Sequence, residues 1–166
     1  KIVGYGSERI WVSTFHSSCV RILRRHAERL GYANNFAIYD TDDQKSLIKD
    51  IMKRLQMDPK LYRDRAIMAA IDDAAISSAK DEMIEPDQYR IDAGIDWKLQ
   101  KYAAVYAEYQ AELKKNNAMD FDDLLVQTVK LFQQFPEVLD YYQEQFRYIM
   151  VDEYQDTNTV QFRFVS

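Results

Sequence analysis

The hydrophobic and polar positions predict a chain made mostly of helices, framed by two short apolar runs. Between residues 34 and 117, apolar side chains recur every three or four positions, which is typical of helices with one buried face. Residues 10–14 and 148–152 are instead short runs that contain β-branched and aromatic side chains, as buried strands do. We therefore expect a mostly α fold whose ends belong to a parallel α/β sheet.

Helix start signals divide the middle of the chain into successive helices. Thr41 and Gln44 have the spacing of a capping box, in which two side chains satisfy the first backbone N–H groups of a helix. Asp58 and Pro59 are suited to cap and begin the next helix. A further helix is expected over residues 64–81. These helices need one another to bury their apolar faces.

A long amphipathic helix is predicted over residues 96–116. Its apolar face carries Leu99, Tyr102, Ala103, Tyr106, Tyr109 and Leu113. Because tyrosine joins a large apolar ring to a polar hydroxyl, we interpret the three tyrosines as a packing stripe with solvated hydroxyls. A base-stacking surface is the alternative. Asp120 then caps a helix that runs to about residue 134, and Pro136 begins a short one.

The distance between the two apolar runs indicates an insertion. If both runs are strands of one parallel sheet, about 130 residues connect them, whereas a simple crossover needs roughly a dozen. We predict that residues 1–33 belong to an α/β domain, that residues 34–117 form an inserted all-helical unit, and that residues 118–166 return to the first domain.

Composition narrows the class of protein. Hydrophobic residues make up 47% of the 166, with only four glycines and three prolines, which indicates an ordered chain. There is no apolar run of the length that spans a bilayer and no signal-peptide pattern, so we expect a cytoplasmic protein that is not bound to a membrane. The single Cys19 and two histidines do not favour a disulfide or a zinc site. A net charge of −5 argues against a surface that is basic all over, so any contact with nucleic acid must come from a few local side chains.

Two adjacent acids follow the second apolar run. The carboxyl ends of parallel strands are where α/β sheets bind ligands, and Asp152 and Glu153 stand at that point. In nucleotide hydrolysis, one acid can hold Mg²⁺ through water while a second deprotonates the attacking water. The alternative is that the acids only cap the helix predicted from Asn158 onward.

Three motifs together resemble one family. Residues 151–158, Val-Asp-Glu-Tyr-Gln-Asp-Thr-Asn, resemble the Walker B segment of the UvrD/PcrA/Rep-type superfamily 1 DNA helicases, and most closely its PcrA branch. Residues 14–17, Thr-Phe-His-Ser, resemble motif Ib of that family, and residues 118–125 resemble its Asp-Phe-x-Asp-Leu segment. The resemblance covers nearly the whole chain. It implies a helical subdomain, 1B, inserted in a truncated RecA-like domain, 1A.

The resemblance implies an ATP-dependent helicase that moves 3′ to 5′ on single-stranded DNA and acts at junctions of single and double strands. Asp152 would hold the Mg²⁺ of bound ATP through water, and Glu153 would be the general base. Gln155 would link the γ-phosphate site to the DNA site. ATP and Mg²⁺ are thus the cofactors expected of the complete protein.

The same resemblance implies five DNA contacts. Thr14, His16 and Ser17 would face the phosphate backbone, Phe121 would touch a base, and Lys80 would approach the duplex. Read without the resemblance, Ser17 is an N-cap, His16 a turn histidine and Phe121 a core residue.

The chain departs from the family in what it lacks. It holds no Gly-x-x-x-x-Gly-Lys-Thr phosphate loop and none of the arginines that the second RecA-like domain supplies. We therefore expect a catalytically inactive, monomeric fragment that binds no ATP or Mg²⁺ itself. Two alternatives are a nuclease that uses Asp122, Asp152 and Glu153 with a metal, and a non-catalytic helical module over residues 34–117.

Overall fold

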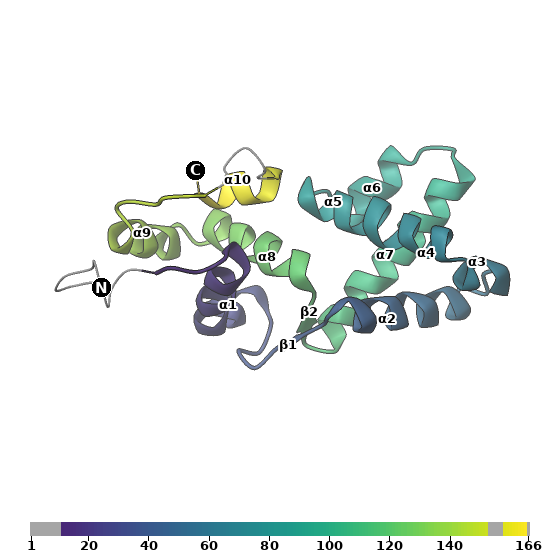
Figure 1. Ribbon diagram of the computed structural model, residues 1–166, viewed down its shortest axis with the longest axis horizontal. Helices are drawn as coiled ribbons and strands as arrows, with labels where there is room; N and C mark the ends of the chain where they lie inside the picture. Colours follow the sequence, from purple (N-terminus) through teal and green to yellow (C-terminus); the bar gives the residue numbers. More distant parts are fainter. Residues whose placement is uncertain (1–10, 153–157, 166) are drawn as a thin grey trace.

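Helices make up most of residues 11–152 and 158–165, which are the residues described by a computed structural model (Figure 1). In chain order the elements are α1 (Phe15–His26), η2 (Ala27–Leu30), β1 (Ala37–Ile38), α2 (Thr41–Arg54), α3 (Pro59–Arg63), α4 (Arg65–Ile71), the π-helix η3 (Asp72–Ser77), α5 (Ser78–Asp81), α6 (Pro86–Asp92), α7 (Trp97–Lys115), β2 (Ala118–Met119), α8 (Phe121–Gln134), α9 (Pro136–Gln145) and α10 (Thr159–Val165). The prediction of a mostly α chain is confirmed. No helix in these ranges is long and apolar enough to cross a membrane.

Helices α2 to α7 form one group with its own apolar core, on the right in Figure 1. Side chains from α2, α4, η3, α5 and α7 meet there, among them Ile48, Ile51, Met52, Ile71, Ala79, Tyr106, Tyr109 and Leu113. Tyr102, Tyr106 and Tyr109 are buried, so the tyrosine face of α7 is a packing face as predicted. Their hydroxyls were expected in solvent, but Tyr106 donates to the Ile84 carbonyl (3.0 Å), because a buried hydroxyl needs a partner.

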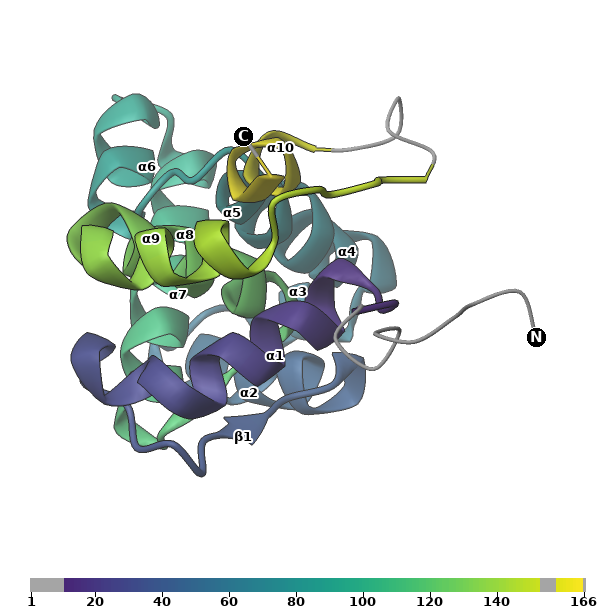
Figure 2. The ribbon, with the colours of Figure 1, turned by 90° about the vertical axis from the view of Figure 1, so that its left-hand side faces the viewer.

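A second group is built around α8, which contacts α1, α9 and α10 (Figures 1 and 2). Its core joins α1, α8 and α10 through residues that include Cys19, Leu23, Leu124, Leu125, Val129 and Val160. Helix α9 adds Val138 and Tyr142, which pack with Ile22, Leu131 and Phe132. Segments from both ends of the chain thus share one core.

A two-stranded parallel sheet joins the two groups. Ala37 pairs with Ala118 and Ile38 with Met119, and the ladder includes a hydrogen bond from the Ala37 N–H to the Asn117 carbonyl (2.9 Å). The chain leaves the α8 group through β1 and returns through β2. This crossing lies beside the boundaries predicted at residues 34 and 117, while the assignment of the parts to subdomains stays a prediction.

The predicted strands at the two ends are not present in the described residues. Residues 11–14 and 148–152 have no strand conformation, and the only sheet among the described residues is β1 with β2. Val12 is 92% exposed, Tyr148 94% and Met150 99%. A strand needs neighbours for its backbone hydrogen bonds and a layer over its apolar face, and the described residues supply neither. The prediction that these runs pair in one sheet is therefore wrong for this part of the chain.

The helix caps follow the predictions with one shift. Asp58 and Asp120 accept backbone N–H groups at the starts of α3 and α8, as predicted, and Asp96 does the same at the start of α7. The capping box of α2 is formed by Asp40 and Asp43 instead of Thr41 and Gln44. Asp40 precedes the threonine and caps equally well, so its carboxylate begins the helix one residue earlier. The helix expected over residues 64–81 is present but contains η3.

Candidate nucleic-acid interface

The start of α1 presents two hydroxyls to solvent. Thr14 caps the helix: its Oγ1 accepts the Ser17 N–H (3.2 Å) and donates to Ser17 Oγ (3.0 Å). Both side chains are exposed. Ser17, which could have been read as the cap, is therefore inside the first turn. Hydroxyls beside the free N–H groups of a helix start are well suited to phosphate oxygens.

His16 and Phe121 lie together although they are far apart in the sequence. Their ring centroids are 6.1 Å apart and the rings are nearly perpendicular, at 87°. Phe121 is the first residue of α8 and is 45% exposed, while His16 is half-buried. A Phe of the core would be covered, so this one is not an ordinary core residue. The fold places an accessible aromatic ring beside the start of α1.

The first turn of α8 holds its own acids in a fixed arrangement. Asp120 Oδ1 accepts the Asp123 N–H (2.8 Å), and Asp123 Oδ2 accepts the Asp120 N–H (3.3 Å). This reciprocal capping box is buried, with both carboxyl side chains at most 2% exposed. Two buried carboxylates in one turn repel each other unless a cation lies near them.

Lys80 is that cation. Its Nζ lies 2.5 Å from Asp120 Oδ2 and 3.0 Å from Asp123 Oδ1, and the side chain is 2% exposed. Burial alone would lower the pKa of Lys80, but the charges of Asp123 and Asp120 outweigh burial and raise it above the ordinary value. The DNA contact predicted for Lys80 stays a prediction, and in this structure the side chain is buried and held by its two ion pairs.

Two side chains of α7 complete this buried network. The Tyr109 hydroxyl donates to Asp120 Oδ2 (2.8 Å), and Gln110 Nε2 donates to Asp123 Oδ1 (2.8 Å). Neither role was predicted from the sequence. The acids at the cap and third positions of α8 are followed by apolar residues, and this pattern could have indicated that the acids are buried and need partners.

Asp122, in the first turn of α8, lies near two further acids, Asp81 and Glu82. Asp122 Oδ2 accepts from Ser77 Oγ (2.7 Å), and Asp81 Oδ1 accepts from Asn158 Nδ2 (2.7 Å). Burial, and then the charges of Asp122 and Glu82, raise the pKa of Asp81 to about 6. These acids repel phosphate, so the start of α1 is the more favourable place for a nucleic-acid backbone.

Comparison with known proteins places the chain in a family. The profile described as "UvrD/REP helicase N-terminal domain" matches residues 2–166. The chain belongs to the UvrD/REP helicase family. It is 51% identical over 164 residues to the ATP-dependent DNA helicase PcrA of Bacillus subtilis, an alignment that covers 99% of the chain and 21% of that protein.

Two further relatives agree with this assignment. The proteins named ATP-dependent DNA helicase PcrA from Staphylococcus aureus (strain Mu50) and Staphylococcus epidermidis are 49% and 48% identical over 165 and 164 residues. Each alignment covers 99% of the chain and 22% of the relative. This UvrD/REP family chain thus spans about a fifth of the length of these relatives, and the predicted family resemblance is confirmed.

The predicted nucleotide-binding residues of this UvrD/REP family chain are only partly described. Asp152 lies in a turn and is exposed. Glu153 and Gln155 fall outside the described residues. Within residues 11–152 and 158–165, no three His, Cys, Asp or Glu side chains are grouped to hold a metal ion. The nuclease alternative needs Asp122 with Asp152 and Glu153, and because Glu153 is outside the described residues this alternative stays untested.

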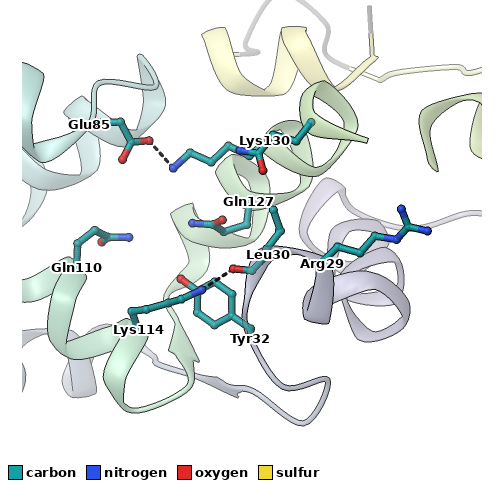
Figure 3. Close-up of a pocket in the computed structure, with 9 residues that line it drawn as sticks. Arg29, Leu30, Tyr32, Glu85, Gln110, Lys114, Gln127 and Lys130 are labelled. Atoms are coloured by element: carbon teal, nitrogen blue, oxygen red, sulfur yellow. Dashed lines mark hydrogen bonds and ion pairs between the residues drawn. The ribbon is translucent and has the colours of Figure 1, made fainter. Parts of the chain in front are cut away.

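A polar cleft of about 340 Å³ lies between η2, α7 and α8, and none of the predicted site residues lines it (Figure 3). It is lined by Arg29, Leu30, Tyr32, Glu85, Gln110, Lys114, Gln127, Lys130 and Gln134. Its lysines are engaged: Lys130 pairs with Glu85, and Lys114 donates to the Leu30 carbonyl (2.5 Å) while lying over the Tyr32 ring. These contacts join the two helical groups of the UvrD/REP family chain.

Proposed function

We propose that this chain is part of a longer ATP-dependent DNA helicase, called here the complete helicase, which moves 3′ to 5′ on single-stranded DNA. The observation that carries the proposal is the contact between His16 and Phe121. Each residue belongs to a different segment that resembles a DNA-contacting motif, and the fold brings both segments to one accessible surface. The identity to PcrA proteins supports the same activity.

The proposed DNA surface consists of two helix starts: the start of α8 contacts a base and the start of α1 contacts phosphate. Phe121 stacks on a base, an interaction worth about 1–3 kcal/mol that does not depend on sequence. Thr14, Ser17 and the first N–H groups of α1 bind phosphate, and His16 lies between the two contacts. With a net charge of −5 and acids beside Phe121, the chain alone attracts DNA weakly and in a salt-sensitive way.

The Asp-Glu segment is proposed to act on ATP only in the complete helicase. Asp152 would hold Mg²⁺ through water, Glu153 would take a proton from the attacking water, and Gln155 would connect this site to the DNA surface. The bound Mg²⁺ would neutralise charge on the phosphates. The chain has no phosphate loop, so we propose that it does not bind or hydrolyse ATP alone.

The remaining parts of the proposal concern organisation. Residues 34–117 are proposed to be subdomain 1B, and residues 1–33 and 118–166 to be parts of domain 1A. In the complete helicase, the apolar residues 148–150 would be covered as a strand of the 1A sheet. We propose a cytoplasmic monomer that acts on single strands and on their junctions with duplex.

A non-catalytic helical module is the second candidate. The observation in its favour is that α2 to α7 bury a core of their own. Such a module would need neither the accessible Phe121 nor the Asp-Glu segment. DNA-stimulated ATP hydrolysis by the complete helicase would decide for the first proposal.

The DNA surface is tested by Phe121→Ala in the complete helicase. We expect affinity for a labelled single-stranded oligonucleotide, measured by fluorescence anisotropy, to fall by about 1–3 kcal/mol, because the stacked base loses its ring. ATP hydrolysis without DNA should stay nearly unchanged. Tyr141→Ala is the control, because this aromatic of α9 is similarly exposed at 52% and its ring contact is with Tyr142 of the same helix. Equal losses in both variants would contradict the proposal.

A further inference from the structure

The α2–α7 group holds the first turn of α8 from two sides. Ser77, at the end of η3, donates to Asp122. Lys80, in α5, forms ion pairs with Asp120 and Asp123. Tyr109 and Gln110 of α7 bind the same pair from another direction. We call Ser77, Lys80, Tyr109 and Gln110 the clamp. It grips all three acids of a turn whose remaining residue is Phe121.

The clamp fixes the position of Phe121, because it binds the residues on both sides of it. Phe121 lies between Asp120, which caps α8, and Asp122, and both are fixed by side chains of the other helical group. The turn cannot rotate about the α8 axis unless the buried ion pairs separate, which would leave carboxylates unpaired in the interior. Among the described residues, the only ring contact of Phe121 is the edge-to-face contact with His16.

The same part of the α2–α7 group also touches the segment that follows the Asp-Glu acids. Asn158 Nδ2 donates to Asp81 Oδ1 (2.7 Å), and Thr159 Oγ1 donates to Glu82 Oε2 (3.3 Å). Asp81 ends α5, one residue after Lys80. One short helix therefore contacts both the turn that carries Phe121 and the chain just beyond the proposed ATP-side acids. The π-helix η3 precedes it, and π-helices often occur at functional sites.

We propose that the clamp is a positioning device: the inserted helical group sets the angle at which Phe121 meets a DNA base, through Lys80, Ser77, Tyr109 and Gln110. This inference rests on the proposed function of Phe121. Lys80 and its neighbours touch no DNA; they act through the first turn of α8. Movement of α5 or α7 relative to α8 changes the base contact directly.

Two tyrosines of α7 give a matched test in the complete helicase. Tyr109→Phe removes the hydroxyl that donates to Asp120 (2.8 Å), and Tyr106→Phe removes a hydroxyl that donates to the Ile84 carbonyl (3.0 Å) and not to α8. Each loses one hydrogen bond, and the loss of thermal stability should be larger for Tyr109→Phe because its acceptor is a carboxylate. We expect Tyr109→Phe to weaken single-strand binding by about two- to fivefold and Tyr106→Phe to leave it unchanged. Equal binding by the two variants would overturn the clamp.

A double-mutant cycle separates positioning from general destabilisation. If the clamp acts through Phe121, Tyr109→Phe should weaken binding no further once Phe121→Ala is present. A loss that persists in that background would show that Tyr109 acts elsewhere. If Phe121→Ala alone has no effect, the proposed DNA contact itself is wrong. If Phe121→Ala weakens binding and Tyr109→Phe does not, only the clamp is wrong.

Hydrogen exchange gives a readout that needs no DNA. In Tyr109→Phe, the amides of residues 121–124 should exchange faster, while those of residues 98–104, earlier in α7, should not change. A stronger variant replaces Lys80 by Met together with Asp120→Asn and Asp123→Asn, which removes the three charges and leaves no unpaired carboxylate of this cluster in the interior. It should fold and bind single strands more weakly than Tyr109→Phe. Binding at the wild-type level in this variant would refute the proposal.

Discussion

The α2–α7 group and residues 147–152 both carry apolar side chains, but these side chains have very different surroundings. In the first, Ile48, Ile51 and Tyr109 are almost completely buried. In the second, Tyr148 and Met150 are almost completely exposed. A helix satisfies its own backbone and finds a partner nearby in the sequence, whereas a strand needs neighbours that can come from anywhere in a protein. Periodicity therefore predicts the helices well and the sheet poorly.

The largest expected effect is on ATP turnover and concerns Glu153, which follows the apolar residues 148–151. In the complete helicase, Glu153→Gln keeps the side-chain size but removes the base, so ATP turnover should fall by about 10²–10⁴-fold while nucleotide binding remains. Steady-state hydrolysis and a nucleotide-binding titration measure the two effects. Turnover by the 166-residue chain alone that survives Glu153→Gln would show that the active site lies elsewhere.

Breaking the buried ion pairs should cost the most stability. Lys80→Met leaves Asp120 and Asp123 buried without their cation, so the free energy of unfolding should fall by about 3–5 kcal/mol. Urea unfolding of the chain measures it. Lys53→Met, which removes an exposed pair with Asp50, should change stability by less than about 1 kcal/mol. A small loss for Lys80→Met would mean that the buried pair is not formed in solution.

The contrast between buried helix and exposed segment can be tested by truncation. Ile48→Ala removes a fully buried side chain and should cost about 2–5 kcal/mol. Met150→Ser should cost less than about 0.5 kcal/mol in the chain alone, because the side chain is 99% exposed. In the complete helicase the same change should destabilise clearly if residues 148–150 join a sheet there. No difference between the two contexts would remove the support for that sheet.

The smallest effect depends on pH. The Asp81 pKa is raised from its ordinary 3.8 to about 6, so its ionised form is disfavoured by folding. This cost is absent below about pH 4 and grows as the pH rises through 6. Asp81→Asn keeps an acceptor for Asn158 and should stabilise the chain by about 1 kcal/mol at pH 7.5, allowing for solvent screening, and not at pH 4.

Thermal melts at the two pH values measure this difference. Asp87→Asn, a change at an exposed acid of α6, is the control and should shift stability by less than about 0.5 kcal/mol at either pH. An equal gain for Asp81→Asn at both pH values would contradict a cost from ionisation.

Local chemistry explains which features were predictable. Asp58, Asp96 and Asp120 cap helices through backbone groups two or three residues away, so the sequence nearby is sufficient. The start of α2 was misplaced by one residue because Asp40 and Thr41 are both good caps.

Long-range chemistry explains the rest. The burial of Lys80 depends on acids about 40 positions later, and nothing in its own neighbourhood indicates them. The buried hydroxyl of Tyr109 depends on the same acids. Of the site, the family resemblance alone selected Thr14, His16, Ser17 and Phe121, and their DNA contacts remain predictions; the contact between His16 and Phe121 became visible only in the structure.

Single-stranded DNA is proposed to bind where the starts of α1 and α8 meet, and hydrogen exchange of the complete helicase with and without a thymidine oligonucleotide can test this. We expect slower exchange at residues 15–18 and 121–124 when DNA is bound, and no change at residues 138–144 of α9. Protection of α9 together with no change at the two helix starts would show that DNA binds elsewhere.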